Sequence, residues 1–230
     1  MGKIQTGRNL PLATAIGLGL ILLVVLTLFI NKYVFVFLAL AALLLASHEI
    51  STQWAEKKNI QISYSLVAVS IIAMTILTAV NGVQGLVTAY AGALVLNIIF
   101  AFLSRKDSSF FSIFGISFFT FTYLGVFGSL AMLMLRAEDG AGRVFLFIAI
   151  TALSDTGGYL TGMLIGKHRI APSISPKKSY EGLLGSLIFA SVFAVLVGPY
   201  FVEINTNQAI ILGISLAIFG TAGDLFESYL

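Results

Sequence analysis

The chain has 230 residues, of which 58% are hydrophobic and only 10% are charged. Soluble proteins carry about 25% charged residues, so water-soluble globular, disordered and coiled-coil proteins are excluded. A formal net charge of +3 is too small to indicate nucleic-acid binding, and the lack of Cys excludes disulfides and thiolate metal sites. The composition therefore indicates a polytopic integral membrane protein.

Apolar segments divide the chain into about eight candidate transmembrane helices, so the predicted fold is an all-α helical bundle. A bilayer core of about 30 Å needs roughly 20 apolar residues in a helix. The runs are continuously apolar rather than alternating, which argues against outer-membrane strands. We expect the first run to be a retained helix rather than a signal peptide, and the second is short for a full span. The predicted spans are residues 10–30, 33–48, 62–80, 83–103, 110–135, 144–166, 180–202 and 208–230.

The distribution of basic residues predicts a cytoplasmic N-terminus. With that orientation ten basic residues fall on the inner side and three on the outer side, in accordance with the positive-inside rule. The inner residues are Lys3, Arg8, Lys57, Lys58, Arg105, Lys106, Lys167, Arg169, Lys177 and Lys178; the outer ones are Lys32, Arg136 and Arg143. An even number of spans also places both chain ends inside.

The loop over residues 167–180 is the most unusual connection, with two Pro, three Ser and four basic residues. Ser175 followed by Pro176 is typical of a helix N-cap with Pro at the first helical position. Free amides at a helix start, together with Lys177 and Lys178, would bind a polyanion such as a triphosphate. Alternatively, the two lysines only mark the cytoplasmic interface.

A few ionisable residues lie within or beside the predicted spans, where charges are costly and usually face a bundle interior or water. They include Asp155, Glu181, Asp224 and Glu227. Asp224 and Glu227 are three residues apart and therefore project from one helix face. Such a pair of acids suits Mg²⁺, which is usually bound together with substrate phosphates. The alternatives are an intramembrane ion pair or a helix end that meets water.

Glycines recur every four residues on the predicted helix that carries Asp155. Gly158, Gly162 and Gly166 have the spacing of small residues that allow close helix packing. We interpret them mainly as a packing surface, which would also leave room for a ligand beside Asp155.

Four segments in this order resemble the phosphatidate cytidylyltransferases, also called CDP-diacylglycerol synthases. They are residues 154–159 (SDTGGY), 166–172 (GKHRIAP), 173–182 (SISPKKSYEG) and 223–228 (GDLFES). The strong similarity covers roughly residues 150–230, and the combination of segments is very specific. The resemblance implies a nucleotidyltransferase that moves a cytidylyl group from CTP to phosphatidic acid, giving CDP-diacylglycerol and pyrophosphate in phospholipid biosynthesis.

The resemblance also implies roles for particular residues and an organisation of the chain. Residues 1–143 would form about five N-terminal spans, and residues 144–230 a catalytic region whose site faces the cytoplasm at the cell (inner) membrane. Mg²⁺ is the implied cofactor, with a second cation left open; the partners are CTP, phosphatidic acid and membrane lipids, and a homodimer is also left open. The implied roles are Asp224 as metal ligand, Glu227 completing that site, Asp155 and Glu181 shaping the polar cavity or contacting nucleotide, and Ser175, Lys177, Lys178 and Ser179 binding the CTP phosphates.

One departure from the family pattern concerns the end of the chain. The family signature continues past the Gly-Asp-Leu segment into further basic and acidic motifs, whereas this sequence stops at Leu230. We therefore expect a C-terminally truncated family domain, whose isolated activity is an open question. The alternatives are a CTP-dependent lipid-alcohol kinase, a transporter and a non-catalytic membrane scaffold.

Overall fold

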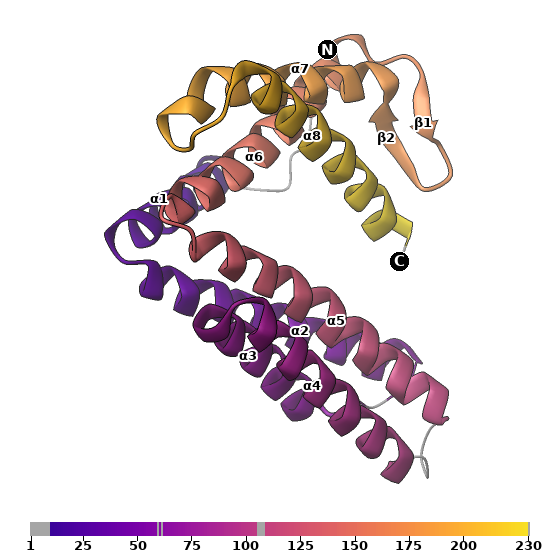
Figure 1. Cartoon of the computed structure of the whole chain (residues 1–230). Coiled ribbons are helices and arrows are strands. Elements are labelled where there is room, and N and C mark those ends of the chain that lie inside the picture. The colour runs from indigo at the N-terminus through magenta and orange to yellow at the C-terminus, as the bar shows by residue number, and fades with distance from the viewer. Residues whose placement is uncertain (1–9, 59, 61, 105–108, 230) are drawn as a thin grey trace. The chain divides into compact units, whose positions relative to one another are not determined.

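The computed structural model describes residues 10–58, 60, 62–104 and 109–229, apart from some side chains within the helices and strands. This part of the chain contains eight α-helices and one two-stranded β-hairpin (Figure 1). The chain divides into two compact units, residues 1–141 and residues 142–230. The prediction of an all-α, polytopic helical bundle is confirmed, with the small hairpin as an addition that the sequence did not indicate.

Five helices make up the first unit. Buried apolar residues of α3, α4 and α5 form its core, among them Ile71, Met74, Ala93 and Phe121. The five helices are α1 (Leu10–Ile30), α2 (Lys32–Lys58), α3 (Tyr64–Asn81), α4 (Val83–Leu103) and α5 (Phe110–Leu135).

Arg136 closes the end of helix α3 in the first unit. Its Nη1 donates to the carbonyls of Ala79 at 2.6 Å and Val80 at 2.7 Å. The last carbonyls of a helix have no hydrogen-bond partner within the helix. A cation at this end also interacts favourably with the negative end of the helix dipole. Gly82 follows with a φ of 65°, a left-handed conformation that lets the chain reverse directly into α4.

Three long helices and the hairpin make up the second unit. Helices α7 and α8 approach closely through small side chains: a Cβ on Gly213 of α8 would lie 2.6 Å from Ser191 Cα of α7. Small residues let helix backbones come together in this way. The elements are α6 (Gly140–Ile165), β1 (Arg169–Ala171), β2 (Ser175–Ser179), α7 (Tyr180–Val197), the short 3-10 helix η1 (Gly198–Tyr200) and α8 (Thr206–Tyr229).

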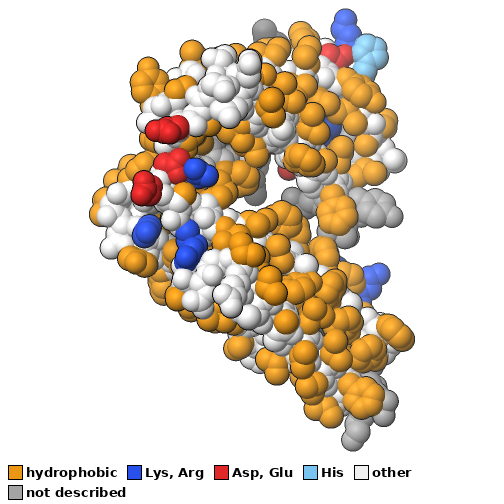
Figure 2. Space-filling model, in the orientation of Figure 1, with side chains coloured by type: hydrophobic (Ala, Val, Ile, Leu, Met, Phe, Trp, Pro, Cys, Tyr) orange, Lys and Arg blue, Asp and Glu red, His pale blue; other side chains and the backbone are white. Residues whose placement is uncertain are grey.

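Seven of the helices among the described residues, α2 to α8, are long and apolar enough to cross a membrane. In α1, the shorter stretch Gly19–Ile30 is apolar. Hydrophobic side chains cover most of the face seen in Figure 2, as expected where lipid replaces water as solvent. The structure thus supports a multi-pass membrane protein.

Helix α2 differs from its prediction because it does not end at residue 48. It continues to Lys58, for a total of 27 residues. The added segment is rich in Glu, Gln, Ala and Lys, which favour a helix without being apolar. The apolar segment therefore ends at residue 48, whereas the helix continues to Lys58.

Candidate active site

A cavity of about 510 Å³ lies in the second unit, and helices α6, α7 and α8 and the β-hairpin all contribute to its walls. One part of the lining is polar or charged and another is apolar, which suits a ligand with both kinds of surface. The polar residues are Asp155, Arg169, Ser175, Lys178, Ser179, Ser186, Thr221 and Asp224. The others are Gly158, Tyr159, Gly162, Met163, Gly166, Ile170, Gly182 and Leu183.

An ion pair joins the hairpin to helix α8 across this cavity. Lys178 Nζ lies 2.6 Å from Asp224 Oδ2, although the two residues are 46 positions apart in the sequence. The lysine side chain is 24% exposed and the aspartate side chain 48%, so both groups remain accessible from the cavity. A cation and an acid within reach of one ligand can bind a phosphate and a metal ion together.

Helix α6 supplies the second carboxylate of the cavity. Asp155, Gly158, Tyr159 and Gly162 all line it, and their spacing of three and four residues places them on one helix face. Asp155 is exposed on that face. Asp155 and Asp224 therefore line the same cavity from two helices.

The glycines of α6 bring this helix close to α7. A Cβ on Gly182 would lie 2.9 Å from the carbonyl oxygen of Gly158 and 3.4 Å from Gly162 Cα. A Cβ on Gly185 would lie 2.8 Å from the carbonyl oxygen of Gly157. Side chains at these positions would separate the helices, in agreement with the packing interpretation of the glycine repeat.

The hairpin replaces the helix start that was predicted at Ser175 and Pro176, and that prediction is wrong. Residues Ser175–Ser179 form strand β2, which pairs antiparallel with β1. Helix α7 begins at Tyr180, and Ser179 is its N-cap, with Oγ accepting from the backbone N–H of Gly182 at 3.1 Å. Glu181 thus occupies the first turn, where a negative charge is favourable, and the lysines lie on a strand.

Both predicted phosphate-binding serines line the cavity. Ser175 lies at the start of β2 and Ser179 at its end. Ser179 is buried and its oxygen accepts one hydrogen bond, which leaves its hydroxyl hydrogen able to donate. The side chains of Lys177 and Glu227 lie outside the described part of the structure; their backbones belong to β2 and α8.

Glu181 contacts His168, the residue just before strand β1, and is not among the residues that line the cavity. One of its carboxylate oxygens lies 2.7 Å from His168 Nδ1. The backbone N–H of His168 also lies 3.3 Å and 3.2 Å from the two carboxylate oxygens. The structure thus gives Glu181 a protein partner.

Comparison with known proteins places this arrangement in a family. The model of the cytidylyltransferase family matches residues 12–230. The chain belongs to this family. Its membership confirms the predicted resemblance and the prediction of a nucleotidyltransferase.

Several relatives of this chain are named phosphatidate cytidylyltransferase. A phosphatidate cytidylyltransferase of Mycobacterium leprae is 29% identical over 243 residues, covering 97% of this chain and 76% of the relative. The same-named protein of Mycobacterium bovis is 28% identical over 241 residues, covering 97% and 77%. The one from Staphylococcus aureus (strain COL) is 43% identical over 93 residues, covering 40% and 35%.

Arg169 is a cavity residue of this family member that sequence reasoning did not select. It was one of the inner-side basic residues and part of the family segment 166–172, but no site role was assigned to it. In the hairpin, however, Arg169 is paired with Ser179 and lines the cavity together with Lys178. Strand register brings it there, and the hydropathy of the chain carries no sign of that register.

The donor set of the cavity fits a divalent cation of the Mg²⁺ type. Mg²⁺ is usually held by one or two carboxylates, with waters and substrate phosphates completing its coordination. Asp155 and Asp224 provide two carboxylates in one cavity. Among the described side chains no group of three or more His, Cys, Asp or Glu could hold a metal ion; at these two carboxylates, waters or substrate oxygens would complete the coordination.

Proposed function

We propose that the protein is a phosphatidate cytidylyltransferase, which transfers the cytidylyl group of CTP to phosphatidic acid. The observation that carries the proposal is the 2.6 Å contact of Lys178 with Asp224 in a cavity that Asp155 also lines. The name shared by the relatives and the membership of the cytidylyltransferase family support the choice of substrates.

In the proposed reaction a phosphate oxygen of the lipid attacks the α-phosphorus of CTP. The new P–O bond forms as the bond to the β-phosphate oxygen breaks, so that the products are CDP-diacylglycerol and pyrophosphate. Such a transfer needs little covalent chemistry from the protein. Positioning of the reactants and neutralisation of charge account for most of the rate enhancement.

The residues of the cavity divide these tasks. Lys178, together with Lys177, would bind the CTP phosphates, and the hydroxyls of Ser175 and Ser179 would donate to phosphate oxygens. Lys178 is already held at the cavity by Asp224, so its ammonium group need not be ordered when the nucleotide binds.

Asp224 and Asp155 would hold Mg²⁺, with Glu227 completing that site. When bound, the ion would neutralise charge on the phosphate oxygens. The two carboxylates alone would repel the triphosphate, and Lys178 counters that repulsion at Asp224.

The apolar part of the cavity suits the lipid substrate. Tyr159, Met163 and Leu183 line it beside the charged residues, so a phosphate with an attached acyl glycerol would meet both surfaces it requires. Helices α6 to α8 are apolar enough to lie in the bilayer, where phosphatidic acid and other membrane lipids are found. We place the site at the cytoplasmic face of the cell (inner) membrane because the basic hairpin is expected there.

A labelling experiment tests the proposal. The protein in lipid vesicles with phosphatidic acid is given CTP and Mg²⁺, with the radiolabel either at the α-phosphorus or at the γ-phosphorus. We expect the α-label to enter the lipid and the γ-label to appear in pyrophosphate. Entry of the γ-label into lipid would indicate a lipid kinase, and no transfer from either position would contradict the proposed activity.

The same assay tests the assignment of Asp224. Asp224→Asn keeps the shape of the side chain but removes its charge, and should lower the rate by at least about 100-fold. Glu203→Gln is the matched control, because Glu203 is exposed in the same unit and does not line the cavity. Wild-type turnover of Asp224→Asn would remove Asp224 from the metal-binding role.

A further inference from the structure

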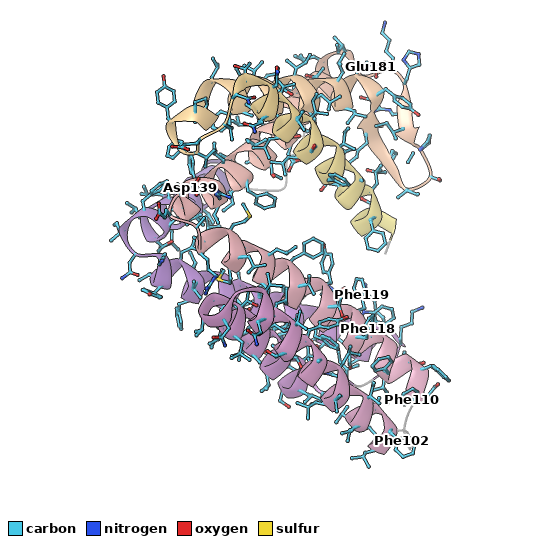
Figure 3. The ribbon with its side chains drawn as sticks, viewed as in Figure 1. Phe102, Phe110, Phe118, Phe119, Asp139 and Glu181 are labelled. Carbon is cyan, nitrogen blue, oxygen red and sulfur yellow. The ribbon has the colours of Figure 1, made fainter. Side chains whose placement is uncertain are left out.

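The base of the β-hairpin is held by a contact between the residues that enter and leave it. His168 lies between the end of α6 and β1, and Glu181 is the second residue of α7. Their side chains meet with His168 Nδ1 at 2.7 Å from Glu181 Oε1. In Figure 3 the labelled Glu181 lies at the N-terminal end of α7.

Further bonds at this base make the contact more than a surface ion pair. The backbone N–H of His168 lies 3.3 Å and 3.2 Å from the two oxygens of Glu181. In the opposite direction, the backbone N–H of Tyr180 donates to the His168 carbonyl at 2.9 Å. A side-chain pair alone at an exposed site contributes little, but here one carboxylate binds both the backbone and the ring of the same residue.

This contact lies next to the residue on which the proposed reaction depends. Lys178 is three residues before Glu181, and β2 is fixed to β1 through the pairing of Ser179 with Arg169. The position of the Lys178 ammonium group therefore depends on how the end of β2 is fixed. Glu181 holds the end of β2 from outside the cavity, since Glu181 is not one of the residues that line the cavity.

We infer that Glu181 and His168 are positioning residues: they clamp the base of the β1–β2 hairpin so that Lys178 reaches Asp224 and the nucleotide phosphates. This inference rests on the proposed function. It gives Glu181 a task different from direct contact with the nucleotide, which the family resemblance left open.

The two roles differ in whether the negative charge of Glu181 is needed. A clamp needs hydrogen bonds, and Gln at position 181 would still accept from the backbone N–H of His168 and could donate to the ring nitrogen. A carboxylate that contacts metal or substrate needs its charge. Glu181→Gln and Glu181→Ala thus separate the two.

The experiment compares the kinetics of these two variants with the wild type in lipid vesicles. We expect Glu181→Ala to raise the KM for CTP by about tenfold with a smaller change in kcat, because the phosphate-binding lysine is displaced. Glu181→Gln should stay within about threefold of the wild type, since the hydrogen bonds are retained. Glu203→Ala, an exposed acid of the same unit, is the control and should change neither constant.

A measurement without turnover keeps this test separate from that of the proposed function. Site-resolved labelling of lysines by an amine-reactive reagent should show faster modification of Lys178 in Glu181→Ala than in the wild type, with Lys57, which is exposed at the end of α2, as the internal reference. If Glu181→Ala does not fold, His168→Ala replaces it, because that variant removes only the ring contact and keeps the backbone bonds.

The inference fails if Glu181→Gln loses as much activity as Glu181→Ala, which would indicate a direct role of the charge. It also fails if Glu181→Ala changes neither the KM for CTP nor the labelling of Lys178. Absence of cytidylyl transfer in the wild type would contradict the proposed function instead, and the labelling result would still decide on the clamp.

Discussion

The contact of Lys178 with Asp224 is the smallest unit on which the proposed chemistry depends. A lysine paired with a carboxylate is held in place, yet both side chains are partly exposed to the cavity. In the proposed function, the positive charge that binds a phosphate would therefore be in position before the nucleotide arrives. Arg169 lines the same cavity, so two basic residues of one hairpin contribute to its wall.

Replacing Lys178 by Met keeps an unbranched side chain one atom shorter and removes its charge. We expect kcat/KM for CTP to fall by about 100-fold, because a preorganised cation that stabilises phosphate charge is lost. Lys57→Met is the control, since Lys57 is exposed at the end of α2 and does not line the cavity. The measurement is the initial rate of α-label transfer against CTP concentration; equal loss in both variants would mean that only general charge matters.

The residues of the site were predicted unequally well, for a physical reason. Asp155 and Asp224 are charges within apolar segments, and the cost of such charges singles them out in the sequence; Lys178 was selected from the polar segment that precedes α7 and from the family resemblance. The structure brings all three to one cavity. Arg169 and the partnership of His168 with Glu181 depend on the register of two short strands, which composition does not encode.

At the scale of elements, the glycines decide how closely α6 and α7 approach. Gly182→Ala would place a Cβ 2.9 Å from the carbonyl oxygen of Gly158, and should destabilise the protein by about 1–3 kcal/mol through overpacking. Gly220→Ala is the matched control, because a Cβ at this position in helix α8 meets nothing within 4 Å. It should be neutral or stabilise by up to about 1 kcal/mol, since Ala is the better helix former.

Thermal unfolding in detergent measures both glycine variants. We expect a lower midpoint for Gly182→Ala and an unchanged or higher one for Gly220→Ala. Equal midpoints would mean that α6 and α7 separate without cost, and that the glycine repeat is not a packing surface.

The long helices could be predicted because apolar runs of their length have few other structures available in a bilayer. The hairpin could not, because β1 has only three residues and β2 is the polar sequence SPKKS. In the sequence, Ser175 followed by Pro176 fits a helix start as well as it fits a strand. Only the N-cap formed by Ser179 in the structure shows that the helix begins later, at Tyr180. The end of α2 was misplaced because hydropathy measures the span and not the helix.

At the scale of the whole molecule, the remaining question is which side of the membrane the hairpin faces. Ten basic residues favour the inner side and three the outer side. Residues 167–179 alone supply four of the ten. CTP would reach the protein from the cytoplasm, which is also the side that the basic residues favour. The distribution of charge and the source of the proposed substrate therefore predict the same orientation.

Single cysteines test this orientation directly, because the chain has no Cys of its own. Ser173, in the hairpin turn, and Glu138, between α5 and α6, are both exposed. In intact cells a membrane-impermeant maleimide should label Glu138→Cys and spare Ser173→Cys, and permeabilised cells should show labelling of both. Labelling of Ser173→Cys alone in intact cells would reverse the orientation. It would also place the proposed phosphate-binding lysines on the side opposite the nucleotide, which the proposed function could not accommodate.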